Sequence, residues 1–273
     1  MSKNKTIIIA PAIKTKFWKQ IYKTLSKGKS DFHLIFVGHV KPSFKLPPNF
    51  TYIYCDLPAA ACVEIAYRYA YKNIKDAEYI VNIADDLWFS ENFIEEMASF
   101  YNEQQKKYNT DLLLIGPTCL MGTGEENLMA THDGGPSLLA PAFTTIENSK
   151  KIGGVDRRFQ GIYWDCDRAL RMHLMGGKVI FASCEEMTPV SEKEHVPGLY
   201  YRYKNVDRGL LDELWYYNEG DTPIVCAVLD KSDKDYEARY GRKRNNLVIK
   251  NMDIGRVHQV NEFSKDEIGK YYE

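Results

Sequence analysis

Two acidic clusters in the sequence have residue types and positions suited to chemistry. Asp85 and Asp86 directly follow an apolar run at residues 79–84, and Asp165 and Asp167 lie shortly after a glycine-containing turn. Each cluster stands where a chain would leave a buried strand or enter a helix, so both sets of carboxylates can face one cleft. Such an arrangement can hold a divalent metal against a diphosphate while another carboxylate removes a proton.

The pair Asp85-Asp86 also has a simpler interpretation. Two adjacent carboxylates repel each other, and Mg2+ or Mn2+ bound by oxygen ligands relieves that repulsion. Aspartate is equally common in turns and at the starts of helices, where its side chain accepts backbone N–H groups. The pair alone therefore leaves a metal site and a turn both open.

The sequence around the clusters predicts alternating strands and helices. β-Branched and aromatic runs predict strands, and apolar residues at helical spacing predict helices. The expected strands are residues 6–10, 33–37, 50–54, 79–83, 112–115, 137–142 and 178–182, with Gly116-Pro117 breaking the fifth. The expected helices cover about 17–25, 59–71 and 165–175, and a further one is capped by Ser90 and buries Phe93, Ile94, Met97 and Phe100.

This order predicts an α/β fold in which a mostly parallel central sheet is covered by helices on both faces. Ligands of such sheets bind beyond the carboxyl ends of the strands, which is where Asp85 and Asp86 would lie. The polar, charged sequence of residues 216–273 predicts a C-terminal extension that packs on a domain of residues 1–215.

Composition excludes several functions. Apolar residues make up 44% of the chain, which suffices for a buried core. Lysine and arginine number 36 against 37 acidic residues, so the net charge of -1 gives no attraction toward nucleic acid. No apolar run reaches the roughly 20 residues that span a bilayer, and the opening residues lack a signal peptide. We therefore expect a cytoplasmic protein with no transmembrane segment and no nucleic-acid partner. The six cysteines contain no C-x-x-C pair, which predicts buried thiols.

Several stretches, taken in order, resemble GT-A-fold, family-2-type inverting glycosyltransferases. The acceptor-side signature of that family runs G-G-F-D-x-x-F, then E-D-x-D-L-x-x-R, then G-x-x-I on the next strand. The matching stretches are residues 153–159 (GGVDRRF), 164–171 (WDCDRALR) and 177–180 (GKVI). Upstream, residues 77–86 look like the strand that ends in the metal-binding D-x-D motif, and residues 6–11 look like the opening strand. Several motifs in one order are more specific than any of them alone.

The resemblance implies a metal-dependent inverting glycosyltransferase that uses a GT-A-like fold. The donor would be a nucleotide-diphosphate sugar, and the acceptor a hydroxyl of a glycan or glycoconjugate. Asp165 would be the general base that deprotonates this hydroxyl. Asp86 would be the principal ligand of Mn2+ or Mg2+, and Asp85 would contact the ribose or the metal.

On the donor side, the resemblance places Pro11 and Ala12 beside the nucleotide base. Asp56 follows the third strand and would be a substitute base contact, although an ordinary strand-ending turn explains it equally well. His195 stands where relatives place a histidine that ligates the metal or touches the diphosphate. A solvated loop histidine is the alternative.

On the acceptor side, the sequence departs from the family pattern. Trp164 replaces the usual glutamate, and an indole would stack on a sugar face instead of accepting hydrogen bonds from its hydroxyls. Asp167 would contact the acceptor or only fix the loop. His132, in a glycine-rich loop, would line the acceptor side, or the glycines around it would serve only to turn the chain.

Two other functions stay open at this point. A nucleotidyltransferase shares the sheet and the metal, but it has a glycine-rich basic loop after its first strand, which residues 11–15 do not form. A nucleotide-sugar binding module that keeps the fold without turnover would account for the unusual Trp164.

Overall fold

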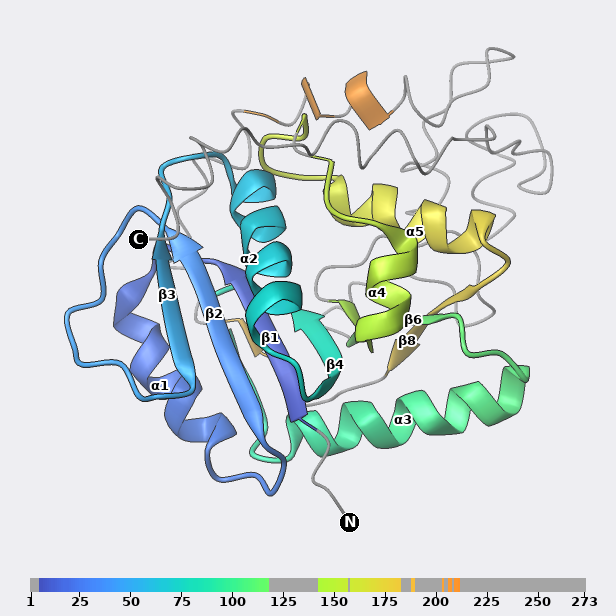
Figure 1. Cartoon of the computed structure of the whole chain (residues 1–273), viewed down its shortest axis with the longest axis horizontal. Helices are drawn as coiled ribbons and strands as arrows, with labels where there is room; N and C mark the ends of the chain where they lie inside the picture. Colours follow the sequence, from blue (N-terminus) through green and yellow to red (C-terminus); the bar gives the residue numbers. More distant parts are fainter. Residues whose placement is uncertain are drawn as a thin grey trace.

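The computed structural model describes residues 5–117, 142–156, 158–182, 188–189, 203, 206–207 and 209–211. The elements, drawn in Figure 1, are β1 (Lys5–Pro11), α1 (Thr15–Leu25), β2 (Phe32–Gly38), β3 (Phe50–Tyr54), α2 (Ala59–Asn73), β4 (Ala77–Asn82), β5 (Leu87–Trp88), α3 (Phe93–Tyr108), β6 (Leu113–Pro117), β7 (Ala142–Thr145), α4 (Ile146–Ile152), α5 (Trp164–Leu174), β8 (Lys178–Ala182) and β9 (Thr188–Pro189).

Seven of the strands form one sheet in the order β3-β2-β1-β4-β7-β6-β8. All neighbouring pairs are parallel except those of β7, which runs antiparallel to both β4 and β6. The two short strands β5 and β9 pair separately. The mostly parallel sheet confirms the predicted fold class.

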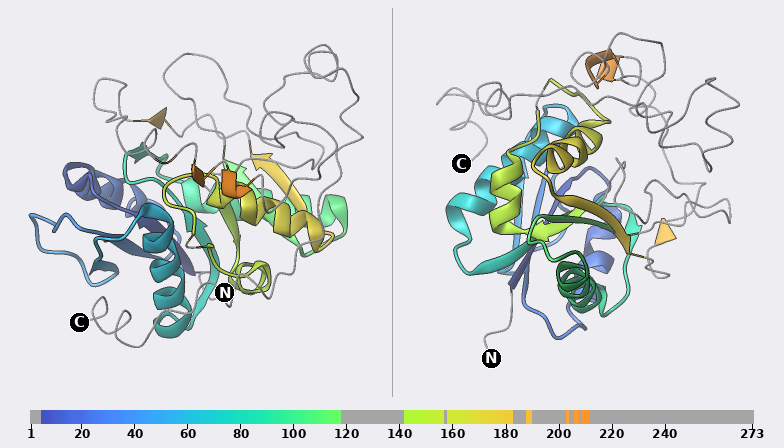
Figure 2. Two further views of the ribbon diagram at one scale, coloured as in Figure 1. Left: turned by 90° about the horizontal axis from the view of Figure 1, so that it is seen from above. Right: turned by 90° about the vertical axis from the view of Figure 1, so that its right-hand side faces the viewer.

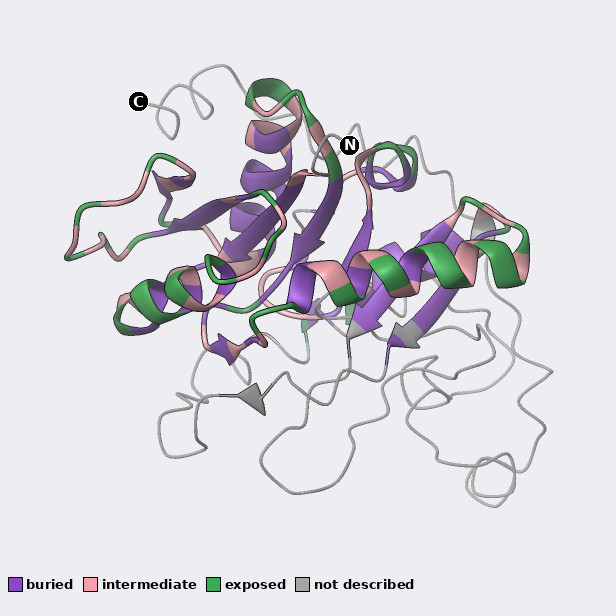
Figure 3. Cartoon of the chain, turned by 90° about the horizontal axis from the view of Figure 1, so that it is seen from below, coloured by how far each residue is buried: buried purple, intermediate pink, exposed green. Residues whose placement is uncertain are grey.

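Helices cover the sheet on both faces, as β1 shows most simply. Ile7 and Ile9 belong to an apolar cluster with residues of α2 and α5, whereas Ile8 and Ala10 belong to a second cluster with residues of α1 and α3. Because side chains alternate along a strand, a strand buried on both faces reads as a continuous apolar run. Figure 2 shows the two helical layers from other directions, and Figure 3 shows the buried strands between them.

The direction of α5 matters for the site. The strand β6 is parallel to β4, because β7 is antiparallel to both, and β8 is parallel to β6. The helix α5 packs on β8 and leads into its first residue through Gly176 and Gly177, so it runs opposite to the strand. The start of α5 therefore lies toward the carboxyl edge of the sheet, the edge where β4 ends.

Two expected element boundaries were wrong. Gly116-Pro117 does not break the strand, because β6 continues through both residues, which pair in register with the last residues of β8. Proline has no N–H to donate to a sheet, and Pro117 pairs with β8 beyond the point, Ile115, at which β6 pairs with β7. Ser90 does not cap α3 either. Asn92 is the N-cap, and the Ser90 hydroxyl donates to the Glu96 carboxylate at 3.4 Å. The buried face also includes Tyr101, whereas Phe100 is half-buried.

The strand expected at residues 137–142 overlaps β7 only at Ala142, and residues 137–141 lie outside the described residues. The short helix α4 directly after it was missed, because its seven residues are mostly polar. Its one signal is Thr145, whose hydroxyl accepts the backbone N–H of Asn148 at 3.1 Å as an N-cap. The predicted extension of residues 216–273 also lies outside the described part of the chain and stays a prediction. No helix in the described ranges is long and apolar enough to cross a membrane.

Gly38 allows the closest backbone approach at the carboxyl edge. A Cβ atom added there would lie 1.9 Å from the Ala12 carbonyl oxygen. The Ala12 backbone is held in place because its N–H donates to the Val37 carbonyl oxygen at 2.8 Å. We expect Gly38→Ala to lower the free energy of unfolding by about 1–3 kcal/mol, as overpacking does. Urea unfolding measures this loss.

Gly209→Ala is the matched control, because a Cβ there meets nothing within 4 Å. It should leave stability unchanged or raise it by up to about 1 kcal/mol. Equal stability of the Gly38 variant and the native protein would contradict the close approach.

Candidate active site

The turn after β4 is tied to the loop after β1 by one carboxylate oxygen. Oδ2 of Asp85 accepts the backbone N–H groups of Ile13 at 2.7 Å and Lys14 at 2.6 Å, and the indole N–H of Trp18 at 3.0 Å. Lys14 is the N-cap residue of α1, a helix that has no acidic residue in its own first turn. Asp85 therefore caps α1 from a different element, and its charge lies favourably at the positive end of the helix dipole.

Burial raises the pKa of Asp85, and the nearby Asp86 charge adds to this, while the three N–H donors act in the opposite direction. The side chain is 5% exposed. Its Oδ2 is thus fully used in joining the ends of β1 and β4. Asp85 positions the edge of the sheet.

The neighbouring Asp86 has a different environment. Its Oδ2 forms an ion pair with the Lys14 ammonium, and the two side chains are 15% and 20% exposed, respectively. The next residue, Leu87, is buried, and the Trp88 ring meets the Phe17 ring edge to face at 6.2 Å. Asp86 is therefore a partly accessible carboxylate that is paired with a cationic group, the Lys14 ammonium.

Asp165 lies in the first turn of α5, at the same edge of the sheet. The preceding Tyr163 has a positive φ of 64°, a strained backbone conformation for a residue with a side chain, and its carbonyl accepts the Asp167 N–H at 3.0 Å. Asp165 keeps an intermediate exposure, yet enough protein surrounds its carboxyl that desolvation raises its pKa to about 6. The Cys166 backbone N–H opposes this rise. A carboxyl of this kind can exchange protons near neutral pH.

A buried ion pair holds the loop that precedes α5. Asp167 and Arg171 are both fully buried and meet at 2.8 Å. The Arg171 guanidinium also donates to the carbonyl oxygens of Ile152 and Gly154, each at 2.7 Å. One turn of α5 thereby fixes the backbone at the end of α4.

Glu64 reaches the same loop from α2. Its buried carboxylate accepts the Val155 N–H at 2.7 Å and pairs with Arg68. Burial raises the pKa of Glu64, and the hydrogen bonds and charges of its partners act against the rise. A Cβ on Gly154 would lie 2.2 Å from Glu64 Oε2, so the second glycine of the G-G motif is what lets the carboxylate approach.

Asp207 holds the rest of the loop. It is fully buried and accepts three consecutive backbone N–H groups, those of Gln160 at 2.8 Å, Gly161 at 2.7 Å and Ile162 at 2.9 Å. These residues immediately precede the strained Tyr163 and the start of α5. Buried carboxylates on both sides of the loop therefore set where Asp165 stands.

No protein-family model and no curated protein matches the sequence. The fold, in contrast, matches solved structures. S. aureus TarS 1-349 superposes with a TM-score of 0.51 and 10% identity, over 89% of this chain and 73% of that chain. A further S. aureus TarS structure gives a TM-score of 0.51 and 9% identity, and this chain spans 44% of its length. The chain has a GT-A-like glycosyltransferase fold.

A third match is a mutant of Drosophila β-1,4-galactosyltransferase 7 in complex with manganese, UDP-Gal and xylobiose. Its TM-score is 0.44 at 13% identity, over 73% of each chain.

Within the GT-A-like fold, the residues predicted on the donor side follow β1, β3 and β4, three parallel strands whose carboxyl ends lie at one edge of the sheet. Pro11 ends β1, Ala12 follows it with its side chain buried, and Asp56 is exposed just after β3. Asp85 and Asp86 follow β4, which lies between β1 and β7 in the sheet. Ala12 is 1% exposed, and its N–H is donated to the Val37 carbonyl oxygen at 2.8 Å.

Two acceptor-side expectations do not fit the geometry. Trp164 is only 7% exposed and packs in the apolar cluster beneath α2, so its ring face is not presented to a sugar. Asp167 is fully buried against Arg171, which is the loop-fixing role considered as its alternative. Both side chains are buried in the protein beside the start of α5. His132 and His195 lie outside the described residues, so their predicted roles stay predictions.

Sequence reasoning missed four residues that shape the site: Lys14, Glu64, Arg171 and Asp207. Arg171 had a signal, since it matches the arginine that closes the E-D-x-D-L-x-x-R motif. The other three act across 45 or more residues of sequence, and nothing in their local pattern marks them.

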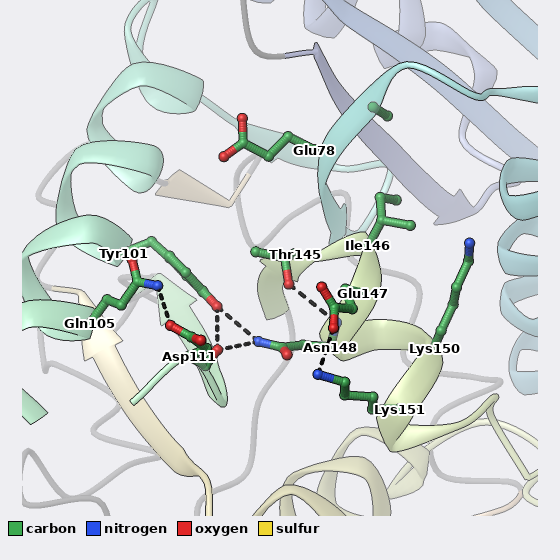
Figure 4. Close-up of a pocket in the computed structure, with 11 residues that line it drawn as sticks. Glu78, Tyr101, Gln105, Asp111, Thr145, Ile146, Glu147, Asn148, Lys150 and Lys151 are labelled. Atoms are coloured by element: carbon green, nitrogen blue, oxygen red, sulfur yellow. Dashed lines mark hydrogen bonds and ion pairs between the residues drawn. The ribbon is translucent and has the colours of Figure 1, made fainter. Parts of the chain in front are cut away.

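A cavity of about 560 Å³ lies away from this edge (Figure 4). It is lined by the start of β4, the middle of α3 and residues of α4. Its polar groups serve one another: the Asn148 amide donates to the Tyr101 hydroxyl at 2.8 Å, and Gln105 donates to Asp111 at 2.5 Å. The hydrogen bond between Asn148 and Tyr101 joins α4 to α3. The cavity is not part of the site.

The Asp207 hydrogen bonds can be tested directly. In Asp207→Asn, the side-chain NH2 group would face at least one backbone N–H, leaving a buried donor without an acceptor. We expect a loss of about 1–3 kcal/mol in the free energy of unfolding, measured by urea titration. The exposed Asp31→Asn is the control and should change stability by less than about 0.5 kcal/mol. If both variants match the native protein, Asp207 does not hold the loop.

Proposed function

We propose that this chain is a metal-dependent, inverting glycosyltransferase. It would transfer a sugar from a nucleotide-diphosphate sugar to a hydroxyl of a glycan or glycoconjugate. The GT-A-like fold supports glycosyl transfer in general. The donor class, the metal and the inversion at the anomeric carbon are proposed in addition.

One observation carries the proposal. Two acidic groups of unlike character, Asp86 and Asp165, lie at the carboxyl edge of one GT-A-like sheet. Asp86 holds a cation, and Asp165 has a pKa of about 6. A carboxylate that contacts a cation and a carboxyl that exchanges protons near neutral pH are suited to different roles in one reaction.

Asp165 would accept the proton of the acceptor hydroxyl. A sugar hydroxyl is a poor nucleophile near neutral pH, and a carboxylate within hydrogen-bond reach lowers the barrier as the new bond forms. Its raised pKa makes it a stronger base than an exposed aspartate while it stays ionised at pH 7. Attack from the side opposite the leaving group would invert the anomeric carbon.

Asp86 is the described residue best placed to hold the metal. No group of three or more His, Cys, Asp or Glu side chains suited to a metal occurs among the residues that the structure describes. A closed cage is not required, because Mg2+ in phosphate-handling sites is commonly bound by one or two carboxylates together with the phosphates and waters. The ammonium on Asp86 supports its fit to a cation. A bound Mn2+ or Mg2+ would stabilise negative charge on the departing nucleoside diphosphate. His195 stays a further candidate ligand.

The nucleotidyltransferase and binding-module alternatives are not favoured. The loop after β1 is fixed to Asp85 through the N–H groups of Ile13 and Lys14, and it carries no run of glycines. A binding module would not need a base, so the behaviour of Asp165 separates it from a transferase.

Donor binding gives the first test. A nucleoside diphosphate that binds with Mn2+ at about 100 times its Kd should stabilise the fold by about 2.7 kcal/mol, a rise of a few degrees in Tm. A thermal-shift series of UDP, GDP, CDP and ADP, each with Mn2+ or with EDTA, measures this. The matching monophosphates are the control and should give smaller shifts. If no diphosphate shifts the Tm, the proposed function is wrong.

The base gives the second test. With a donor found in this way, Asp165→Asn should lower the rate of sugar release about 10²- to 10⁴-fold, since an amide cannot accept the proton. In the native protein the rate should fall about tenfold per pH unit below pH 6, because Asp165 is then protonated. The variant should lack this acidic limb. Rates at several pH values measure both effects.

Asp111→Asn makes the same change away from the site, in the loop between α3 and β6, and should leave rate and pH profile unchanged. An Asp165→Asn variant with native activity would remove Asp165 as the base.

A further inference from the structure

Lys14 and Asp86 form an ion pair at the position where the proposed function requires a metal. The pair joins the N-cap of α1 to the turn after β4. Its side chains are 20% and 15% exposed, whereas a surface pair such as Lys27 and Glu91 is 61% and 56% exposed. Partial burial reduces screening by water, so the Lys14 ammonium competes more strongly for its carboxylate than a surface lysine would.

The backbone of Lys14 cannot move away from this pair. Its N–H is held at 2.6 Å by Oδ2 of Asp85, the residue next to Asp86, and the Ile13 N–H is held by the same oxygen. The ammonium can therefore leave Asp86 by rotation of its flexible side chain alone, and it always stays tethered close by. The pair is thus built for exchange without loop movement.

Charge balance determines when exchange is favourable. A divalent metal that binds Asp86 alone would stand beside the displaced ammonium, and the two like charges would repel each other. A diphosphate with two or more negative charges changes this balance, because it can contact the metal through some oxygens and the ammonium through others. Metal and diphosphate together neutralise the site, whereas metal alone overcharges it.

We propose that Lys14 is an exchangeable counter-cation that makes metal binding depend on the diphosphate. Without donor, its ammonium occupies Asp86 and keeps the metal affinity low. With donor, the metal takes Asp86, and Lys14 turns to the diphosphate. Lys14 is in this sense a positioning residue for the donor. The inference rests on the proposed function, since it takes the metal and the diphosphate from it.

The test measures Mn2+ binding by electron paramagnetic resonance, first with Mn2+ alone and then with inorganic pyrophosphate. For Lys14→Gln we expect Mn2+ alone to bind about five- to tenfold more tightly, because the competing ammonium is gone. Pyrophosphate at saturating Mn2+ should bind the same variant about five- to tenfold more weakly, because it has lost a cationic partner. Opposite changes in the two affinities would not arise from a general loss of structure.

Two further variants control the experiment. Lys27→Gln removes a lysine from an exposed pair with Glu91 and should change neither affinity. Lys14→Arg keeps the cation and should retain the low affinity for Mn2+ alone.

The outcomes separate the inference from the proposed function. If native protein binds Mn2+ with pyrophosphate and Lys14→Gln leaves the affinity for Mn2+ alone unchanged, the exchange is wrong and the proposed function stands. If Lys14→Gln weakens both affinities, the exchange is also wrong. If neither native protein nor any variant binds Mn2+ or pyrophosphate, the proposed function fails, and the exchange fails with it.

Discussion

The buried pair of Asp167 and Arg171 is the interaction on which the geometry of the site depends. It allows the Arg171 guanidinium to lie buried in the core, where it donates to the carbonyl oxygens of Ile152 and Gly154. Buried ion pairs contribute little net stability, because desolvation offsets the attraction. We therefore interpret this pair as fixing the backbone between α4 and α5. That backbone leads into the loop which Glu64 and Asp207 also hold and which ends at the strained Tyr163.

The two adjacent aspartates after β4 show how environment assigns different roles to the same residue type. Asp85 is buried, and one of its oxygens accepts three N–H groups, so it serves as a cap and tie for α1. Asp86 is partly exposed and pairs with the Lys14 ammonium. The sequence leaves a turn and a metal site open for the pair. Asp85 has the contacts of a turn and cap residue, whereas Asp86 contacts the Lys14 ammonium and is the metal ligand of the proposed function.

Much of the fold was predictable because its signals are local. The strands β1, β2 and β4 are continuous apolar runs, and α1 and α2 have regular apolar spacing, so the α/β order follows from periodicity. The helix α4 was not predictable in this way, because seven mostly polar residues carry no apolar stripe and only Thr145 marks its start. The extent of β6 also depended on a partner, since Gly116 and Pro117 stay in the strand through their pairing with β8.

The sequence predicted part of the chemistry of the site, but it did not predict the contacts that hold the site in place. Asp86 and Asp165 stand out because acidic residues at element ends form a local pattern. The burial of Trp164 could not be predicted, because it is decided by packing beneath α2 and not by its neighbours in sequence. Asp167 and Arg171 match positions of the E-D-x-D-L-x-x-R signature, but that signature does not predict that both side chains are buried.

The contacts that hold the site in place join residues that are distant in sequence. Glu64 reaches Val155 across 91 residues, and Asp85 reaches Ile13 across 72. Contacts of such separation form only after the intervening chain has been closed into a loop, which costs entropy before the contact is made. Asp85 accepts backbone N–H groups at the start of α1, and Glu64 accepts one in the loop between α4 and α5. It follows that the site takes its final shape only once the sheet and both helical layers are assembled, and that substitutions in α2 can alter Asp165 without touching it.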